Sequence, residues 1–200
     1  MGLLVEEATG SSLADELRRR IAEPLGLDAT VLHPGAPVPD GTARGYLPHD
    51  NPLVPGPGPG LVDTTDLDMP FSWAGGGMIS TAGDVARFLQ ALLGGEVLPD
   101  RLLAEMLSTV PSPWPETDAY GLGIAEILSL QQEADSPCGS AWGHLGFSPA
   151  GHMTIALASR SGDRQVVLMT NSLPRSTDVW ETLGQVVWPS YCAQSTPKRS

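Results

Sequence analysis

The chain has 200 residues, enough for one domain with a buried core, and its hydrophobic content of 41% is ordinary for a globular protein. It carries 23 acidic and 11 basic residues, and the net charge of −12 argues against nucleic acid and anionic lipid as partners. No apolar run approaches the roughly 20 residues that a membrane span requires. The opening MGLLVEEATG lacks the basic segment of a signal peptide, so the chain as written is expected to be cytoplasmic.

Two helices are predicted at the start of the chain. Residues 1–9 have helical character, and Gly10 is placed to end them. Ser12 is placed to cap a second helix over residues 13–25, where Asp15 completes a capping box. The apolar residues on one face of this second helix are Leu13, Leu17 and Ile21.

Residues 33–70 are predicted to form a long loop, because Pro and Gly deny the backbone regular hydrogen bonding. The segments TARGYL (42–47) and LVD (61–63) supply apolar anchors. They favour an ordered surface excursion over a flexible interdomain linker. Loops of this length in a compact domain are usually functional or mobile.

The clearest helical signal covers residues 80–95, with Ser80 or Thr81 as the cap and two glycines at the end. A shorter helix is expected at residues 99–108. Four strands follow, at residues 120–128, 141–147, 152–160 and 164–172, and then a helix at 176–188. This order predicts an α+β domain, an antiparallel sheet flanked by helices, over residues 1–200 with a tail at 193–200.

The two cysteines, Cys138 and Cys192, leave two alternatives open. A bridge between them would stabilise the fold by about 4 kcal/mol and would imply an oxidising compartment. Two unpaired buried thiols are the alternative, and they would carry no such implication.

The order of the segments resembles the penicillin-recognising serine hydrolases, which include D-alanyl-D-alanine carboxypeptidases, class C β-lactamases and related esterases. The segments are VEEATGSSLADELRRRIAEPLGL, ARGYL, SWAGGGMISTAGDVARFLQALLGG, YGLGI, WGHLG and the pair PCG and YC. The chain looks most like the secreted D,D-carboxypeptidases, in which a disulfide joins the positions of Cys138 and Cys192. The resemblance implies a β-lactamase/transpeptidase-like fold, no cofactor, a small-molecule or peptide substrate, and secretion if the full-length protein has a signal peptide.

Three motifs converge on one pocket in that family: Ser-x-x-Lys with the nucleophile, Tyr-x-Asn, and a Lys/His-x-Gly strand. The resemblance places the third motif at His144, Leu145 and Gly146, where it forms one wall of the site. The backbone N–H of Phe147 would then belong to the oxyanion hole. Trp73 corresponds to an aromatic side chain of the cleft. For His144, an inert, hydrogen-bonded strand histidine is the alternative.

The first two motifs are not found in the sequence. Neither Tyr-x-Asn nor Ser-x-Asn occurs, and the single lysine, Lys198, completes Ser-x-x-Lys only with Ser195, where Pro197 opposes a helix. The resemblance begins inside the helix that follows Tyr-x-Asn in the family. The N-terminal part with the nucleophile is therefore expected to be missing, and these 200 residues are expected to be inactive on their own.

Two departures from the family concern the substrate. Leu145 replaces a small or hydroxylated residue, and Glu126 stands where the carboxypeptidases place a carboxylate-binding arginine. Both changes weaken the recognition of a substrate carboxylate. Neutral amides or esters are therefore expected in preference to peptides that end in D-Ala.

The sequence offers three rival hypotheses. Ser148 in GFSPA loosely resembles a nucleophile elbow, but a strand rather than a helix is predicted after it. His144 and His152 across a turn have no third metal ligand at a suitable spacing, so no metal site is predicted. A non-catalytic binding or regulatory module, or one half of a split enzyme, would be distinguished by exposed apolar surface.

Overall fold

The computed structural model describes most of the chain, in these ranges: 1–33, 38–54, 56, 58–67, 72–113, 117–127, 138–172 and 177–193. The chain forms two compact units, which are described separately. The first comprises residues 1–84, 146–154 and 169–173, and the second comprises residues 85–145, 155–168 and 174–200. Within the described ranges, no helix has the length and apolar character needed to cross a membrane.

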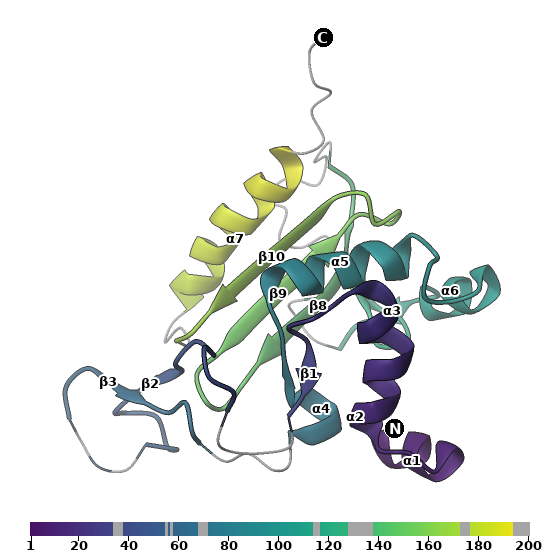
Figure 1. Ribbon diagram of the computed structural model, residues 1–200. Helices are drawn as coiled ribbons and strands as arrows, with labels where there is room; N and C mark the ends of the chain where they lie inside the picture. The colour runs from purple at the N-terminus through teal and green to yellow at the C-terminus, as the bar shows by residue number, and fades with distance from the viewer. Residues whose placement is uncertain are drawn as a thin grey trace. The chain divides into compact units, whose positions relative to one another are not determined.

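Both helices predicted at the start of the chain are confirmed (Figure 1), and their residues belong to the first unit. The helical segments are α1 (Gly2–Thr9), α2 (Leu13–Leu17), a π-helical turn (Arg18–Ala22) and α3 (Glu23–Leu25). Gly10 ends α1 in the left-handed region, with φ of 69°, which glycine adopts without strain. The Ser12 hydroxyl caps α2 by accepting from the backbone N–H of Asp15 at 3.1 Å.

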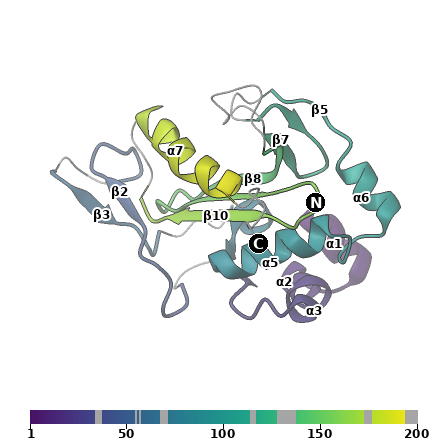
Figure 2. The same ribbon diagram turned by 90° about the horizontal axis from the view of Figure 1, so that it is seen from above.

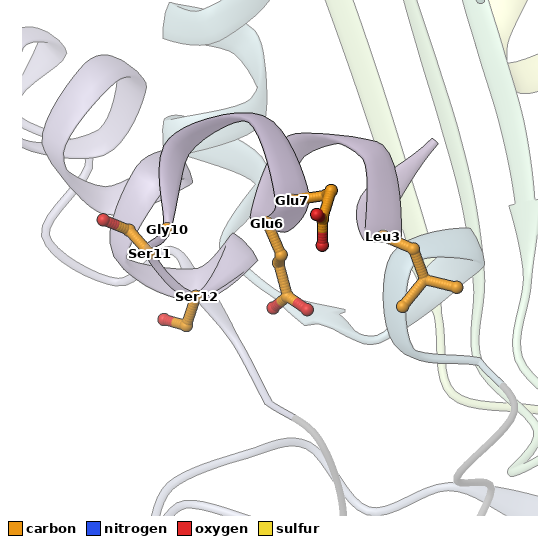
Figure 3. Close-up of a pocket in the computed structure, with 6 residues that line it drawn as sticks. All are labelled: Leu3, Glu6, Glu7, Gly10, Ser11 and Ser12. Carbon is orange, nitrogen blue, oxygen red and sulfur yellow. The ribbon is translucent and has the colours of Figure 1, made fainter.

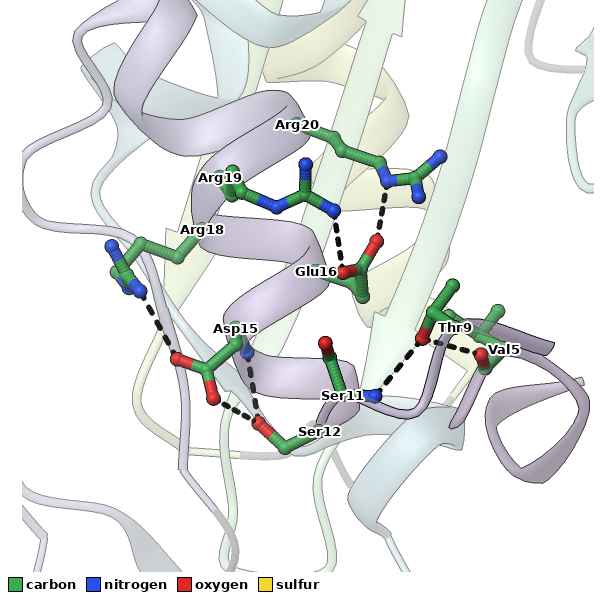
Figure 4. A network of polar contacts seen from close by, with 9 residues as sticks. All are labelled: Val5, Thr9, Ser11, Ser12, Asp15, Glu16, Arg18, Arg19 and Arg20. Atoms are coloured by element: carbon green, nitrogen blue, oxygen red, sulfur yellow. Dashed lines mark hydrogen bonds and ion pairs between the residues drawn. The ribbon is translucent and has the colours of Figure 1, made fainter. Parts of the chain in front are cut away.

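Glu16 is a buried charged residue that the sequence patterns did not single out. Its relative exposure is 3%, and its carboxylate accepts hydrogen bonds from Arg19, at 2.6 Å, and from Arg20 (Figure 4). The bond from Arg19 holds the pKa of Glu16 below its ordinary value, against the opposing effect of desolvation. The two arginines extend into solvent, with exposures of 59% and 60%. They therefore satisfy a carboxylate that would otherwise be costly to bury.

The predicted loop at residues 33–70 contains a β-hairpin, so the prediction of an irregular segment was wrong in part. β2 (Tyr46–Pro48) pairs in antiparallel fashion with β3 (Leu61–Asp63), and Leu47, opposite Val62, is fully buried. The two apolar anchors recognised in the sequence therefore pair with each other. A second short ladder joins β1 (Val31–Leu32) to β4 (Met78–Ile79).

Asp63, at the end of β3, should contribute stability that depends on pH. Its carboxylate accepts from the hydroxyl of Thr65 at 2.6 Å and from the backbone N–H of Thr65 at 3.0 Å, and it pairs with Arg44. These interactions lower the pKa of Asp63 from 3.8 to about 2. A depressed folded-state pKa gives stability that is present above the unfolded value and is lost as the pH falls through the folded value.

The Asp63→Asn variant should therefore be less stable than the wild type near neutral pH, and this difference should shrink between about pH 4 and about pH 2. Urea unfolding across this pH range measures it. In Arg44→Gln the bonds from Thr65 remain, so most of the pH dependence should be retained. A difference between wild type and Asp63→Asn that stays constant with pH would contradict the assignment.

The second unit contains most of a six-stranded antiparallel sheet, which confirms the predicted α+β class. The strand order is β10-β9-β8-β7-β6-β5. The strands are β5 (Val110–Pro111), β6 (Ala119–Tyr120), β7 (Ala125–Ile127), β8 (Ala141–Phe147), β9 (Met153–Ala158) and β10 (Gln165–Thr170). β8 has the bounds predicted from the sequence. The strand expected at residues 120–128 is present at β7 but is separated from β6 by a turn at residues 121–124, so that prediction was wrong in part.

Helices cover both faces of this sheet. Figure 2 shows α5 (Ala82–Leu93) on one side of β10 and α7 (Thr177–Ala193) on the other. A core cluster joins α5 to the sheet through the buried residues Leu89, Leu93, Leu107, Ile124, Trp142, Ala156 and Ala158. α6 (Asp100–Met106) contributes the partly buried Leu103 and Met106 to the same cluster. The helical signal at residues 80–95 therefore predicted this helix correctly.

Candidate active site

The strand β8 carries the third motif, and its two halves have different environments. Ala141, Trp142 and Gly143 are buried, whereas His144, Gly146 and Phe147 are exposed and Leu145 is half-buried. The ladder between β7 and β8 runs from Ala141 to Gly143. β8 therefore continues for four residues beyond the part that this ladder covers, and those four residues are the ones that the resemblance assigned to the site.

The two glycines of WGHLG have different structural roles. A Cβ at Gly143 would lie less than 3.0 Å from the carbonyl oxygen of Ala156, so the close approach of β8 to β9 requires glycine there. A Cβ at Gly146 would have no neighbour closer than the Cβ of Thr154, at 4.0 Å. Packing therefore explains Gly143 but leaves Gly146 unexplained. Because Gly146 has no side chain, a ligand backbone could lie directly against the strand there.

The imidazole of His144 is hydrogen-bonded through both nitrogens. Its Nδ1 lies 2.6 Å from the carbonyl oxygen of Leu145, and its Nε2 lies 2.7 Å from the hydroxyl of Tyr120. The two rings meet edge to face, with centroids 5.7 Å apart and planes at 86°. Tyr120 was missed in the sequence because its approach depends on the β6–β7 hairpin. The register that pairs Tyr120 with Ala125, and Ala125 with Gly143, has no local signature.

The disulfide predicted from the resemblance is present and lies just before β8. Cys138 and Cys192 are bridged, with Cα atoms 5.2 Å apart. The guanidinium of Arg164 donates to the carbonyl of Cys138 at 2.8 Å and lies 4.6 Å from the ring centroid of Tyr191. The buried Tyr191 in turn donates to the carbonyl of Ser140 at 3.0 Å. The end of α7 is thereby tied to the segment that enters β8.

Trp73 belongs to the first unit, where it begins the short helix α4 (Trp73–Gly76). It is half-buried, and its ring packs against Gly2 of α1, where a Cβ would come within 3.0 Å of the indole. The structure therefore shows an aromatic side chain anchored against α1. Its assignment to a substrate cleft stays a prediction.

Ser148 lies in the turn between β8 and β9. Its hydroxyl accepts from the backbone N–H of Ala150 at 3.1 Å, and its own N–H donates to the carbonyl of His152 at 2.8 Å. The Nε2 of His152 lies 2.8 Å from the carbonyl oxygen of Ala43. A strand rather than a helix follows Ser148, as expected, so the geometry of a nucleophile elbow is absent from this turn. Ser195 and Lys198 lie outside the described residues.

A shallow hollow of about 470 Å³ lies between α1 and the start of α2 (Figure 3). Its lining residues are Leu3, Glu6, Glu7, Gly10, Ser11 and Ser12. Glu6 accepts from the backbone N–H of Leu13 at 2.8 Å, so this carboxylate helps to satisfy the first turn of α2. None of the site residues predicted from the sequence lines this hollow.

Comparison with known proteins gives a consistent result. The Beta-lactamase family model matches residues 1–184. A D-amino acid amidase from Ochrobactrum anthropi SV3, complexed with L-phenylalanine amide, is 28% identical, with a TM-score of 0.77 over 98% of this chain and 55% of that one. A D-stereospecific amidohydrolase from a Streptomyces species is 30% identical, with a TM-score of 0.70 over 86% of this chain and 47% of that one.

A curated relative, the human serine beta-lactamase-like protein LACTB, mitochondrial, is 30% identical over 129 residues, which are 59% of this chain and 22% of that protein. The chain therefore spans about half the length of the two solved structures and about a fifth of LACTB.

Proposed function

The chain belongs to the beta-lactamase family, the penicillin-recognising serine hydrolases, and on this premise we propose that it forms one wall of an active site that hydrolyses neutral amides or esters through an acyl-serine intermediate. In such a reaction a serine oxygen attacks the carbonyl carbon, the amine or alcohol leaves, and water then releases the acid from the serine ester. The wall would be made by His144, Leu145 and Gly146. Trp73 and the backbone N–H of Phe147 complete the proposed set.

The observation that carries this proposal is the contrast between Gly143 and Gly146. Packing against β9 requires the first glycine, but no neighbour within 4 Å other than the Thr154 Cβ restricts the second. An unobstructed glycine on the outer half of β8 supports an extended ligand lying alongside the strand, in the manner of β-augmentation. The family match, which extends across this strand, supports the same role.

The proposed substrate is a neutral amide of a D-configured amino acid or a related ester. Glu126 and Leu145 stand where a carboxylate-binding arginine and a small or hydroxylated residue are expected in D,D-carboxypeptidases, and a carboxylate would be repelled by Glu126. The amidases named above act on D-configured amides, as their names state. This agrees with a preference for neutral acyl compounds over peptides that end in a free carboxylate.

The nucleophile is proposed to come from residues outside this sequence. The 200 residues hold one lysine, Lys198, and no Tyr-x-Asn motif. The second candidate, a non-catalytic module or one half of a split enzyme, is favoured by exposed apolar side chains. Leu3 and Leu4 on α1 are 71% and 65% exposed, and Phe147 on β8 is 52% exposed.

Intact mass spectrometry after incubation with a penicillin tests both parts of the proposal. The 200-residue chain should show no adduct. The longest natural translation product that contains it should hydrolyse D-phenylalanine amide and should gain the mass of one penicillin, more slowly than it reacts with the amide because penicillin carries a carboxylate. A stoichiometric adduct on the 200-residue chain, mapped to Ser148 or Ser195, would refute the external nucleophile. If the longest product also stays unmodified and inactive, the non-catalytic module replaces the hydrolase.

A further inference from the structure

We propose that Tyr120 is a positioning residue that holds His144 as the neutral tautomer with its proton on Nδ1. The geometry of this pair stands by itself. Its meaning for catalysis rests on the proposed function, in which His144 lines the site.

The tautomer follows from the partners of the two ring nitrogens. A backbone carbonyl can only accept, so the 2.6 Å contact from Nδ1 to the oxygen of Leu145 requires a proton on Nδ1. In the neutral ring Nε2 then carries a lone pair, which accepts the hydroxyl proton of Tyr120 at 2.7 Å. The carbonyl of Leu145 selects this tautomer, and the hydroxyl of Tyr120, which can donate or accept, stabilises it by donating to Nε2. An exposed histidine without such partners would interconvert between its two neutral forms.

The backbone around Tyr120 fixes where its hydroxyl lies. The next residue, Gly121, donates to the carbonyl of Ile124 at 2.8 Å and starts the turn from β6 to β7. A Cβ at Gly121 would lie less than 3.0 Å from the carbonyl oxygen of Met106, so the turn is seated against the end of α6. Gly123 adopts φ of +78°, which the tight turn needs. The position of Tyr120 therefore depends on the fold rather than on a flexible loop.

The pair defines what this wall can offer a substrate. With Nδ1 bonded to Leu145 and Nε2 bonded to Tyr120, both ring nitrogens are engaged within the protein, so neither is directed at a ligand carboxylate. A wall that offers no imidazole N–H to a carboxylate suits an uncharged amide or ester better. Tyr120 would thus contribute to substrate class through His144, without itself being a catalytic residue.

Nitrogen-15 NMR of the folded chain tests the inference without any need for activity. Long-range proton–nitrogen spectra at neutral pH distinguish protonated from unprotonated ring nitrogens, and the loss of one set of signals in His144→Gln assigns His144 among the four histidines. The wild type should show a protonated Nδ1 and an unprotonated Nε2. In Tyr120→Phe the Nε2 signal should move toward that of an unbonded nitrogen, and the population with the proton on Nε2 should increase.

Two further variants test whether the effect of Tyr120→Phe is specific to the position of its hydroxyl. Tyr46→Phe removes a hydroxyl from β2 and should leave the signals of His144 unchanged. Gly121→Ala keeps the hydroxyl of Tyr120 but displaces the turn, so it should reproduce the effect of Tyr120→Phe. The amide spectrum of each variant shows whether it is folded.

A wild type with its proton on Nε2, or a folded Tyr120→Phe variant with unchanged His144 signals, would overturn the inference whatever the acylation assay gives. The proposed function can also fail by itself. If the spectra behave as expected and no natural translation product that contains the chain is acylated, the proposed function fails while the Tyr120–His144 pair stands.

Discussion

Loss of the disulfide between Cys138 and Cys192 should lower the free energy of unfolding by about 4 kcal/mol. The bridge closes a loop with a sequence separation of 54 residues, and a crosslink of that span removes conformational entropy from the unfolded chain. Equilibrium urea unfolding of the double variant Cys138→Ser/Cys192→Ser, compared with the oxidised wild type, measures the difference.

Most of this effect should arise in the unfolded state, because other contacts hold the same two segments together in the fold. Arg164 bonds to the carbonyl of Cys138, and Tyr191 bonds to the carbonyl of Ser140. The double variant should therefore keep a native-like spectrum while it loses stability.

Arg164→Met is the matched control for the disulfide. It removes the charge-assisted hydrogen bond to the carbonyl of Cys138, a longer one to the hydroxyl of Tyr191 and a cation–π contact, and the loss should cost about 2 kcal/mol, less than the bridge. Equal stability of the double variant and the wild type would contradict the expected effect. Alkylation of both cysteines without prior reduction would show that the purified protein lacks the bridge, and the argument for an oxidising compartment would go with it.

Local chemistry explains which parts of the fold could be predicted from the sequence. Gly10 ends a helix because glycine tolerates a positive φ, and Ser12 begins the next because its hydroxyl accepts a free backbone N–H. The strand at residues 141–147 was predicted with the bounds that β8 has in the structure. In each case the determining interaction lies within a few residues of the signal.

The missed features depend on contacts between distant residues. Glu16 is buried and is paired with Arg19 and Arg20, and no hydrophobic pattern predicts a buried carboxylate. The hairpin of β2 and β3 pairs Tyr46 with Asp63 across 17 positions of Pro- and Gly-rich sequence. The Pro and Gly content of this segment indicates a loop, but it does not indicate which flanking residues pair with each other.

The candidate site also combines a feature that could be predicted from the sequence with one that depends on contacts between distant residues. The third motif could be assigned by resemblance, but the hydroxyl partner of His144 could not, because Tyr120 lies 24 positions away and reaches it only after β6 and β7 fold back on each other. The resemblance assigned Gly146 rather than Gly143 to the site, but the local sequence does not show how the surroundings of these two glycines differ. One faces the backbone of β9 and the other faces open space.

Substitution of these two glycines by alanine should therefore give opposite results. Gly143→Ala should destabilise the chain by about 3 kcal/mol, because the new methyl group meets the carbonyl of Ala156, which the sheet holds in place. Gly146→Ala should change the free energy of unfolding by no more than about 0.5 kcal/mol, since a Cβ there has room. Urea unfolding of the two variants, measured side by side with the wild type, gives both values.

The effect on the acylation rate should be larger for Gly146→Ala than for Gly143→Ala, which is the reverse of their effects on stability. In a natural translation product that contains the chain and reacts with penicillin, Gly146→Ala should slow acylation by about a hundredfold, because the added methyl group displaces the ligand backbone from its productive position. Each variant serves as the control for the other, since they add the same methyl group three residues apart on one strand. A Gly146→Ala variant that is stable and acylates at the wild-type rate would mean that no ligand lies against this part of β8. The proposed wall would then have to be placed elsewhere.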